Sequence, residues 1–272
     1  MLVINNYRLP VMILLFLFGL SVGSFLNVVS RRLLRGERVG GRSRCEYCGR
    51  KLAWLDLVPL LSFVFLRGRC RYCGAKLSWQ YPLVELATGF LFVVLSIFSV
   101  RRLVANSSPI AYCLSITALF VASCSLVVIF ITDLLEQRVF DAVVWAGILS
   151  AFIYQLSTVS YQLLAIVPSL LLAGGTFLFF WLLRVVTHGR GMGEGDPLLG
   201  FLCAFLVGFP LGLVMLFIAF TTGAAVGLVL VLLKRKKFGE QVAFGPFLVV
   251  ATFASIFAGE YFLGWYLGLL GF

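Results

Sequence analysis

The sequence predicts an all-α polytopic membrane protein of about eight transmembrane helices, with a small cytosolic four-cysteine zinc-binding domain between the first and second helices. Hydrophobic residues make up 61% of the 272 residues, and the mean hydropathy is +1.06. Charged residues make up only 12%, about half of the roughly 25% found in soluble domains. The apolar segments are continuous and do not alternate with polar residues, which excludes a transmembrane β-barrel.

Apolar segments account for most of the chain. A helix needs about 20 apolar residues to cross a bilayer, and all but one of the segments come near that length. They cover about 9–29, 82–100, 110–132, 140–158, 162–183, 197–207, 210–233 and 244–271. The sixth is too short to cross comfortably, so we expect it to be tilted or sunk among the other helices.

The distribution of basic residues supports this arrangement. Of the 22 Lys and Arg, all but Arg8, Arg101 and Arg102 fall on one side of the predicted membrane, which the positive-inside rule assigns to the cytosol. Without the sixth span, the basic cluster at 234–237 would move to the opposite side. The net charge of +11 is therefore mostly a signal of membrane topology. Because the basic residues flank membrane spans, we expect membrane lipid and no nucleic acid as a partner.

The only sizeable polar segment, 31–81, contains an internal repeat. The sequence Arg44–Leu52 (RCEYCGRKL) recurs as Arg69–Leu77 (RCRYCGAKL), and Trp54 and Trp79 follow at the same offset. The repeat has a period of 25 residues. Each copy has the form of a metal-binding knuckle, in which a glycine after Cys-x-x-Cys turns backbone N–H groups toward the sulfurs.

Four cysteines of this repeat, Cys45, Cys48, Cys70 and Cys73, are the predicted metal ligands. Four thiolates suit a closed tetrahedral Zn²⁺ site, and the spacing is close to that of known zinc sites. Two disulfides or a redox pair are the alternatives. Thiols are kept reduced in the cytosol, so the predicted location favours zinc.

Between the knuckles, Leu52–Leu66 is apolar but is broken by Asp56 and Pro59. Its 15 residues are too few to cross a bilayer. We expect it to lie along the membrane surface or to pack on other helices.

Asp133 and Asp196 are the candidate catalytic residues. The chain has only 11 Asp and Glu, and acidic residues are costly next to lipid. Both candidates fall at predicted cytosolic ends of apolar segments. Two facing carboxylates, one charged and one neutral, are what an aspartyl protease needs. The alternative is structural, with Asp133 as a loop carboxylate or the ion-pair partner of Arg138.

Gly193 and Gly195 belong to the loop that precedes Asp196. A glycine-rich loop that binds phosphate requires a strand before it, whereas a membrane helix precedes this one. We therefore predict a tight turn with few side chains, which lets backbone approach a peptide substrate. Glu136, Asp141 and Glu194 are the competing acidic residues nearby.

These motifs together closely resemble the bacterial type IV prepilin peptidases, Gly-x-Gly-Asp aspartyl proteases of the membrane. The likeness extends over essentially the whole chain. The segments that carry it, besides the knuckles, Asp133-Leu134 and Gly193–Asp196, are Gly23–Val28, Arg31–Leu33, Pro59–Ser62, Leu66–Cys70, Tyr81–Leu86 and Phe244–Phe247. Two positions depart from the family pattern: Phe140 replaces a usual Pro, and Leu198 replaces a usual Lys.

The resemblance implies a bifunctional enzyme of the bacterial cytoplasmic (inner) membrane. It would cleave the basic leader of prepilins and pseudopilins on the cytosolic side, then N-methylate the new terminus with S-adenosylmethionine, whose binding residues are unknown. Two alternatives remain: a Gly-x-Gly-Asp protease without methyl transfer, and a non-catalytic zinc-containing membrane scaffold. The predicted domains are 1–30, the first transmembrane helix; 31–81, the four-cysteine zinc-binding domain; and 82–272, the protease core.

Overall fold

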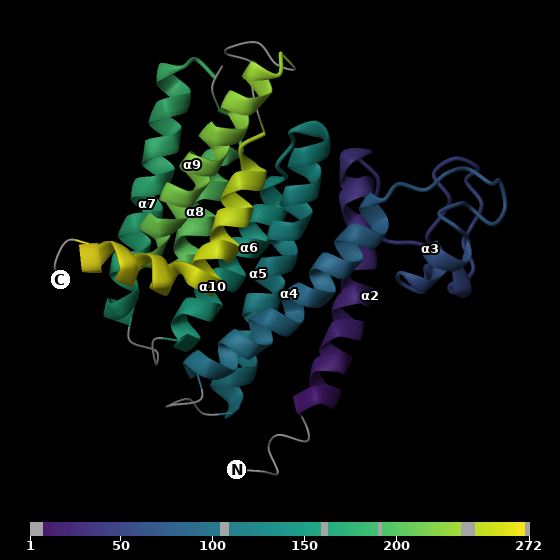
Figure 1. The fold of residues 1–272 in the computed structure, drawn as a ribbon, viewed down its shortest axis with the longest axis horizontal. Helices are drawn as coiled ribbons and strands as arrows, with labels where there is room; N and C mark the ends of the chain where they lie inside the picture. The colour runs from purple at the N-terminus through teal and green to yellow at the C-terminus, as the bar shows by residue number, and fades with distance from the viewer. Residues whose placement is uncertain (1–7, 104–108, 159–162, 190–191, 235–242, 270–272) are drawn as a thin grey trace. The chain divides into compact units, whose positions relative to one another are not determined.

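The computed structural model describes residues 8–103, 109–158, 163–189, 192–234 and 243–269. Regular structure in these ranges is helical except for two isolated β-bridges, which confirms the predicted all-α class (Figure 1). The chain divides into two compact units, 1–101 and 102–272. The basic residues at 235–237, which the charge argument used, lie outside the described ranges.

The first unit is built on two long helices, α2 (Arg8–Leu34) and α4 (Gln80–Leu103). They approach closely through glycines: a Cβ added to Gly19 would lie 2.8 Å from the Cα of Gly89. Small residues allow such close backbone contact between membrane helices. The polar segment between the two helices contains only a short 3-10 helix and one turn of α-helix, η1 (Trp54–Leu57) and α3 (Leu61–Phe65).

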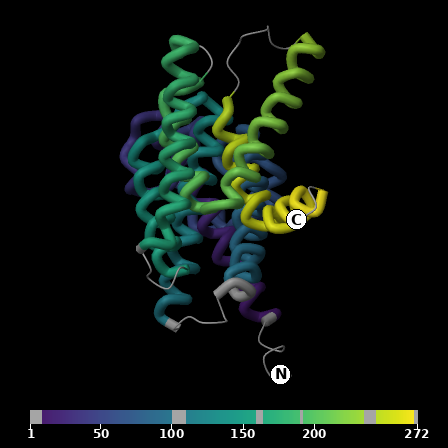
Figure 2. The backbone as a smooth tube through the Cα atoms, turned by 90° about the vertical axis from the view of Figure 1, so that its left-hand side faces the viewer, coloured from purple at the N-terminus to yellow at the C-terminus, as the bar shows by residue number. Residues whose placement is uncertain are grey.

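The second unit contains the remaining helices. They are α5 (Pro109–Glu136), α6 (Asp141–Thr158), α7 (Leu163–Val186), α8 (Asp196–Val207), α9 (Leu211–Leu232) and α10 (Gly245–Leu269). The closest pairings are α5 with α6, α9 with α10, and α7 with α8. In both views α10 changes direction along its length, so its last turns leave the line of its first turns (Figures 1 and 2).

The short helix α8 is the centre of this unit. It has 12 residues, most of them buried, and it contacts α6, α7, α9 and α10. The expectation that the sixth segment is sunk among other helices is therefore confirmed. A helix this short cannot cross the bilayer by itself, and the surrounding helices shield its ends from lipid.

Each predicted span contains a helix, although the helices differ in length. Six are long and apolar enough to cross a membrane, namely α2, α4, α5, α7, α9 and α10, among the described residues. Two helices continue beyond the predicted spans: α2 reaches Leu34 and α5 reaches Glu136. The backbone hydrogen bonds of a helix form within the helix itself, so a helix can continue beyond its last apolar residue. Asp133 consequently lies within α5.

Candidate functional site

Asp133 lies in the last turn of α5. The Gln137 N–H donates to the Asp133 carbonyl oxygen at 2.9 Å, and Gln137 has a φ of 55°, which ends the helix. A short turn then leads into α6. The Asp133 side chain points inward, and the residue is only 4% exposed.

Asp196 is the first residue of α8. Its Oδ2 accepts a hydrogen bond of 2.8 Å from the Gly193 N–H, so the carboxylate folds back over the preceding loop. Pro197 follows in the first turn, where its missing N–H costs nothing. The N-terminus of a helix also favours a negative charge. Asp196 is 5% exposed.

The two carboxylates line one cavity of about 320 Å³. They are close enough for their charges to repel each other. Among the described residues, Asp133 Oδ2 is buried and has no hydrogen-bond partner. The remaining lining residues are Gln137, Arg138, Val139, Phe140, Met192, Gly193, Glu194, Gly195, Ala243 and Phe244. Two adjacent buried carboxylates, one with a free oxygen, provide the groups that activate a water and polarise a carbonyl.

Glycines allow the loops around this cavity to come together. A Cβ added to Gly195 would lie 2.4 Å from the Cβ of Val139, in the turn after α5. A Cβ added to Gly245 would lie 2.5 Å from Asp133 Oδ2. Real Cβ contacts are not this short, so both positions require glycine because of packing. We predicted Gly195 for a different reason, namely room for a substrate backbone.

The competing acidic residues have other placements. Arg138 forms its ion pair with Glu136, at 3.6 Å, and not with Asp133. Glu194 pairs with Arg184, and its side chain is 88% exposed. Asp141, the first residue of α6, is exposed and does not line the cavity. Asp133 and Asp196 are the two buried acids of this unit in the described part of the chain.

Sequence reasoning gave no role to two residues that shape the cavity, Val139 and Gly245. Gly245 appeared only within the Phe244–Phe247 motif of the family resemblance. Its position at the start of α10, next to Asp133, depends on the packing of α10 against α5. No local sequence pattern reports a contact between helices so far apart in the chain.

The four predicted metal ligands also come together. The Sγ atoms of Cys45, Cys48, Cys70 and Cys73 all lie within 4.8 Å of one another, and none is in a disulfide. Cys45 Sγ and Cys73 Sγ are 3.9 Å apart. In a tetrahedral site with zinc–sulfur bonds of about 2.3 Å, the sulfurs would lie about 3.8 Å apart. The donor set therefore fits a four-thiolate zinc ion.

The two knuckles have the same local structure. In the first, the Cys45 N–H donates to the Arg50 carbonyl and the Gly49 N–H to the Cys45 carbonyl, both at 2.9 Å. The second repeats these bonds at Cys70 and Gly74 with the same lengths. Gly49 and Gly74 have φ values of 69° and 70°, which only glycine adopts without strain. The sequence repeat is thus a structural repeat.

The electrostatic environment of Cys73 favours a bound cation. The Ala75 backbone lowers the pKa of Cys73. Desolvation and the thiols of Cys70, Cys48 and Cys45 together outweigh this effect and raise the pKa to about 11. Removing a proton beside three other sulfurs is unfavourable unless a cation is bound. A coordinated metal ion reverses this preference and deprotonates the thiols.

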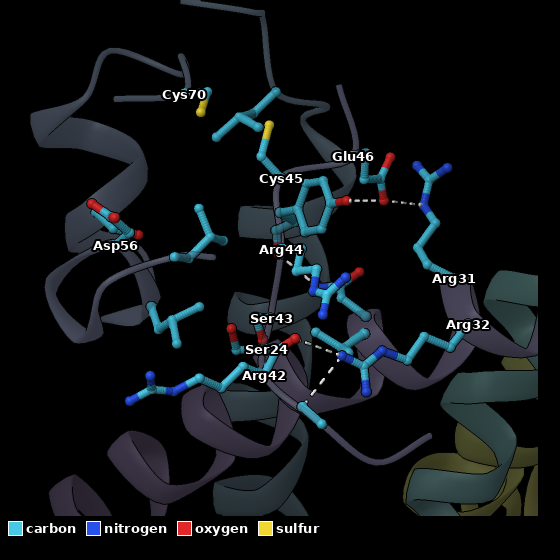
Figure 3. A pocket seen from close by; sticks show the side chains of 18 of the residues that line it. Ser24, Arg31, Arg32, Arg42, Ser43, Arg44, Cys45, Glu46, Asp56 and Cys70 are labelled. Carbon is cyan, nitrogen blue, oxygen red and sulfur yellow. Dashed lines mark hydrogen bonds and ion pairs between the residues drawn. The ribbon is translucent and has the colours of Figure 1, made fainter. Parts of the chain in front are cut away.

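A second cavity, of about 590 Å³, lies in the first unit beside the knuckles (Figure 3). Seven arginines line it: Arg31, Arg32, Arg35, Arg38, Arg42, Arg44 and Arg71. Arg32 is occupied by backbone carbonyls of 39–42. Glu46 pairs with Arg35 at 3.1 Å and accepts a hydrogen bond from Tyr81 at 2.7 Å. Sequence reasoning missed this cavity because it assigned the basic residues to topology alone.

Comparison with known proteins identifies two family matches along the chain. Residues 17–99 match the model described as the Bacterial Peptidase A24 N-terminal domain, and residues 120–228 match the Type IV leader peptidase family. Together, the two matches include the cysteine cluster and both aspartates. No solved structure matches the chain.

Several matching relatives are named prepilin leader peptidase/N-methyltransferase. The protein of Aeromonas hydrophila is 29% identical over 281 residues, which cover 93% of each chain. That of Klebsiella pneumoniae is 38% identical over 194 residues, 67% of this chain and 78% of the relative. That of Burkholderia pseudomallei (strain 1026b) is 33% identical over 274 residues, 90% of this chain and 84% of the relative. Likeness of this extent reflects common descent, and the chain belongs to the type IV leader peptidase family.

Proposed function

We propose that this chain is a multi-pass membrane enzyme that removes the leader peptide of prepilins and pseudopilins and then methylates the new amino terminus. The observation that carries the proposal is the pair of buried carboxylates, Asp133 and Asp196, at one cavity. Relatives named for both activities match nearly the full length of the chain. Membership of the family alone does not name the residues that react, and the shared cavity supports the proposal that Asp133 and Asp196 are those residues.

The proposed proteolysis uses the aspartates as a unit. One carboxylate takes a proton from a water molecule, whose oxygen attacks the scissile carbonyl carbon, while the other, protonated, donates a hydrogen bond to the carbonyl oxygen. The carboxyl group that took the proton from water then gives it to the leaving amine, and the tetrahedral intermediate collapses as the carbon–nitrogen bond breaks. Gly193 and Gly195 present backbone at the rim, where a peptide can align.

We place this cavity at the cytosolic face of the bacterial inner membrane. The proposal rests on the basic residues, because Arg138 borders Asp133 and Arg184 lies near the glycine loop. The positive-inside rule assigns such termini to the cytosol. A leader rich in basic residues would remain on the same side.

Zinc, bound by Cys45, Cys48, Cys70 and Cys73, has a structural role in this proposal. Four protein ligands fill a tetrahedral site and leave no position for a water or substrate. The cluster therefore holds the two knuckles together, and hydrolysis does not pass through it.

The arginine-lined cavity is where we propose that S-adenosylmethionine binds. Its volume of about 590 Å³ lies within the range of small-molecule sites. Arg31 Nε is buried and lies 3.8 Å from Glu46 Oε1, an ion pair without a hydrogen bond, so it can still donate to a ligand carboxylate. Glu46 can accept from hydroxyl or amino groups, and Tyr81 and Phe63 offer apolar faces. When bound, the cofactor supplies an electrophilic methyl group.

A single assay tests the proposal. The purified chain is incubated with a prepilin and S-adenosylmethionine, and the product is weighed by mass spectrometry. Leader loss plus one methyl group is the expected result. Leader loss alone indicates a protease without methyl transfer, and an unchanged prepilin indicates a scaffold.

A further inference from the structure

An exposed apolar surface lies between the two knuckles, on η1 and α3. Its six large side chains are between 41% and 80% exposed: Trp54, Leu55, Leu57, Leu61, Val64 and Phe65. We call these residues the apolar surface. Exposure of this many large apolar side chains within 12 positions marks an interaction site.

No exposed charge interrupts this surface. Asp56 is the one charged residue in 52–66, and its side chain is only 3% exposed. It is held inward by a 2.7 Å ion pair with Arg71 and a 3.0 Å hydrogen bond from the Ala53 N–H. The local structure thus withdraws the carboxylate and leaves apolar groups outside.

The position of the segment along the helices fixes its depth. The Leu60 N–H, just before α3, donates to Glu85 Oε2 at 2.8 Å. Glu85 lies in the second turn of α4, and a Cβ added to Gly23 would lie 2.8 Å from its Cα. Gly23 is about six residues, or roughly 9 Å along the helix, before the end of the predicted span at about 29. Gly23 and Glu85 both lie within helices that are long and apolar enough to span a membrane.

The picture of the first unit agrees with this depth. Figure 1 shows α3 toward the middle of α2 and not beyond its C-terminal end. Side chains at that level face the bilayer unless protein covers them. Arg67 and Arg69, both exposed, follow α3 directly. Cations beside an apolar surface complement the anionic headgroups of a bacterial membrane.

We propose that the apolar surface inserts into the headgroup and upper acyl region of the same bilayer that α2 and α4 cross. Its occupant is therefore lipid. Helices that lie in the interface bury an apolar face about 5–10 Å into the boundary between headgroups and acyl chains, and Trp is enriched at this interface. The four-cysteine zinc-binding domain is thereby docked on the membrane at a third point, besides its two connections to α2 and α4.

Photocrosslinking in intact cells tests this proposal. Benzoylphenylalanine replaces Phe65 in the full-length chain, and a matched variant carries it in place of Tyr47. Tyr47 is a suitable control because it is aromatic, 69% exposed and located within the first knuckle, next to the charged Glu46. After irradiation, the purified protein is digested and adducts are identified by mass.

A phospholipid-mass adduct at position 65 and none at position 47 is the expected result. An adduct with a peptide from residues 102–272, a crosslinked dimer, or no adduct at 65 would each overturn the proposal. Zinc content and leader cleavage are measured on both variants to verify folding. If the variant at 65 loses zinc, the same probe replaces Leu61, which is 54% exposed on the same helix.

Discussion

Asp133 lies in the last turn of α5 and Asp196 is the first residue of α8, so the two carboxylates meet at helix ends of opposite polarity. The α8 end and the Gly193 N–H both favour a negative charge on Asp196. Asp133 lies instead at a C-terminal helix end, and its backbone support comes from another helix, at Gly245, the first residue of α10. The two acids therefore have different environments, although they share one cavity.

Replacing either aspartate by its amide should abolish leader cleavage. We expect Asp133→Asn and Asp196→Asn to lower the cleavage rate by at least about 10²-fold, because each loses a group that transfers a proton. Leader loss is followed by mass spectrometry on membranes with equal amounts of enzyme. Glu136→Gln is the control, since Glu136 is exposed and pairs with Arg138. Cleavage at the normal rate by either asparagine variant would refute the assignment of Asp133 and Asp196 as the catalytic pair.

Gly195→Ala should also lower cleavage, by pushing apart the loops that hold the aspartates. The added Cβ would lie 2.4 Å from Val139 Cβ, so the second substitution Val139→Gly should restore part of the lost activity. Gly174→Ala is the control, because an added Cβ there meets nothing within 4 Å. Additive losses in the double variant would show that the two residues do not act through this contact.

One zinc ion per chain is expected, and its affinity should fall as the pH falls. Protons compete with the metal for thiolates, and the metal-free Cys73 thiol has a pKa raised to about 11. Metal analysis of purified protein at several pH values checks this. Cys113→Ser, which removes a cysteine outside the cluster, should keep its zinc. Metal-free protein under reducing conditions, or disulfides in the cell, would contradict the site.

Cys70→Ser combined with Cys73→Ser should lower methylation more than cleavage. The aspartates lie outside 31–81, so hydrolysis needs no residue from the knuckles. The cavity proposed for S-adenosylmethionine, in contrast, is lined by Cys45 and Cys70. Both activities are measured on one prepilin in one membrane preparation. Equal loss of the two would favour a clamp on the leader or general unfolding.

Glu46→Gln should weaken binding of S-adenosylhomocysteine to the purified chain about tenfold, the effect of losing a hydrogen bond to a charged group. Calorimetry gives the affinity without depending on turnover. Arg38→Gln, at the exposed rim of the same cavity, should change it less. Cleavage should be unaffected by either change. Unaltered binding to Glu46→Gln would place the cofactor elsewhere.

Much of the architecture could be predicted from the sequence. Continuous apolar runs of this length specify helices without knowledge of what packs against them. The short run at 197–207 corresponds to the buried helix α8. The cysteine repeat specified its own geometry, because each knuckle is closed by bonds within a few residues. Asp133 and Asp196 stood out as acids at the ends of apolar segments, and the structure places both at one cavity.

Contacts between distant segments could not be predicted in the same way. The approach of Gly195 to Val139, and of Gly245 to Asp133, depends on how α5, α8 and α10 pack. The arginine-lined cavity has the same origin, since Arg31 and Glu46 reach it from different segments. Counting charges along the chain predicts the membrane topology, but it does not predict which of those side chains lie together in space.

The 25-residue spacing between the knuckles gives the metal a mechanical role. An ion bound by Cys45 and Cys70 closes the intervening chain into a loop, and in the chain-entropy treatment of cross-links such closure removes about 3–4 kcal/mol of freedom from the unfolded state. The closed loop is the one that carries Trp54 and Phe65. Chelation should therefore release the ends of that loop and weaken its attachment to lipid, so metal supply and membrane attachment would be linked through a single ring of chain.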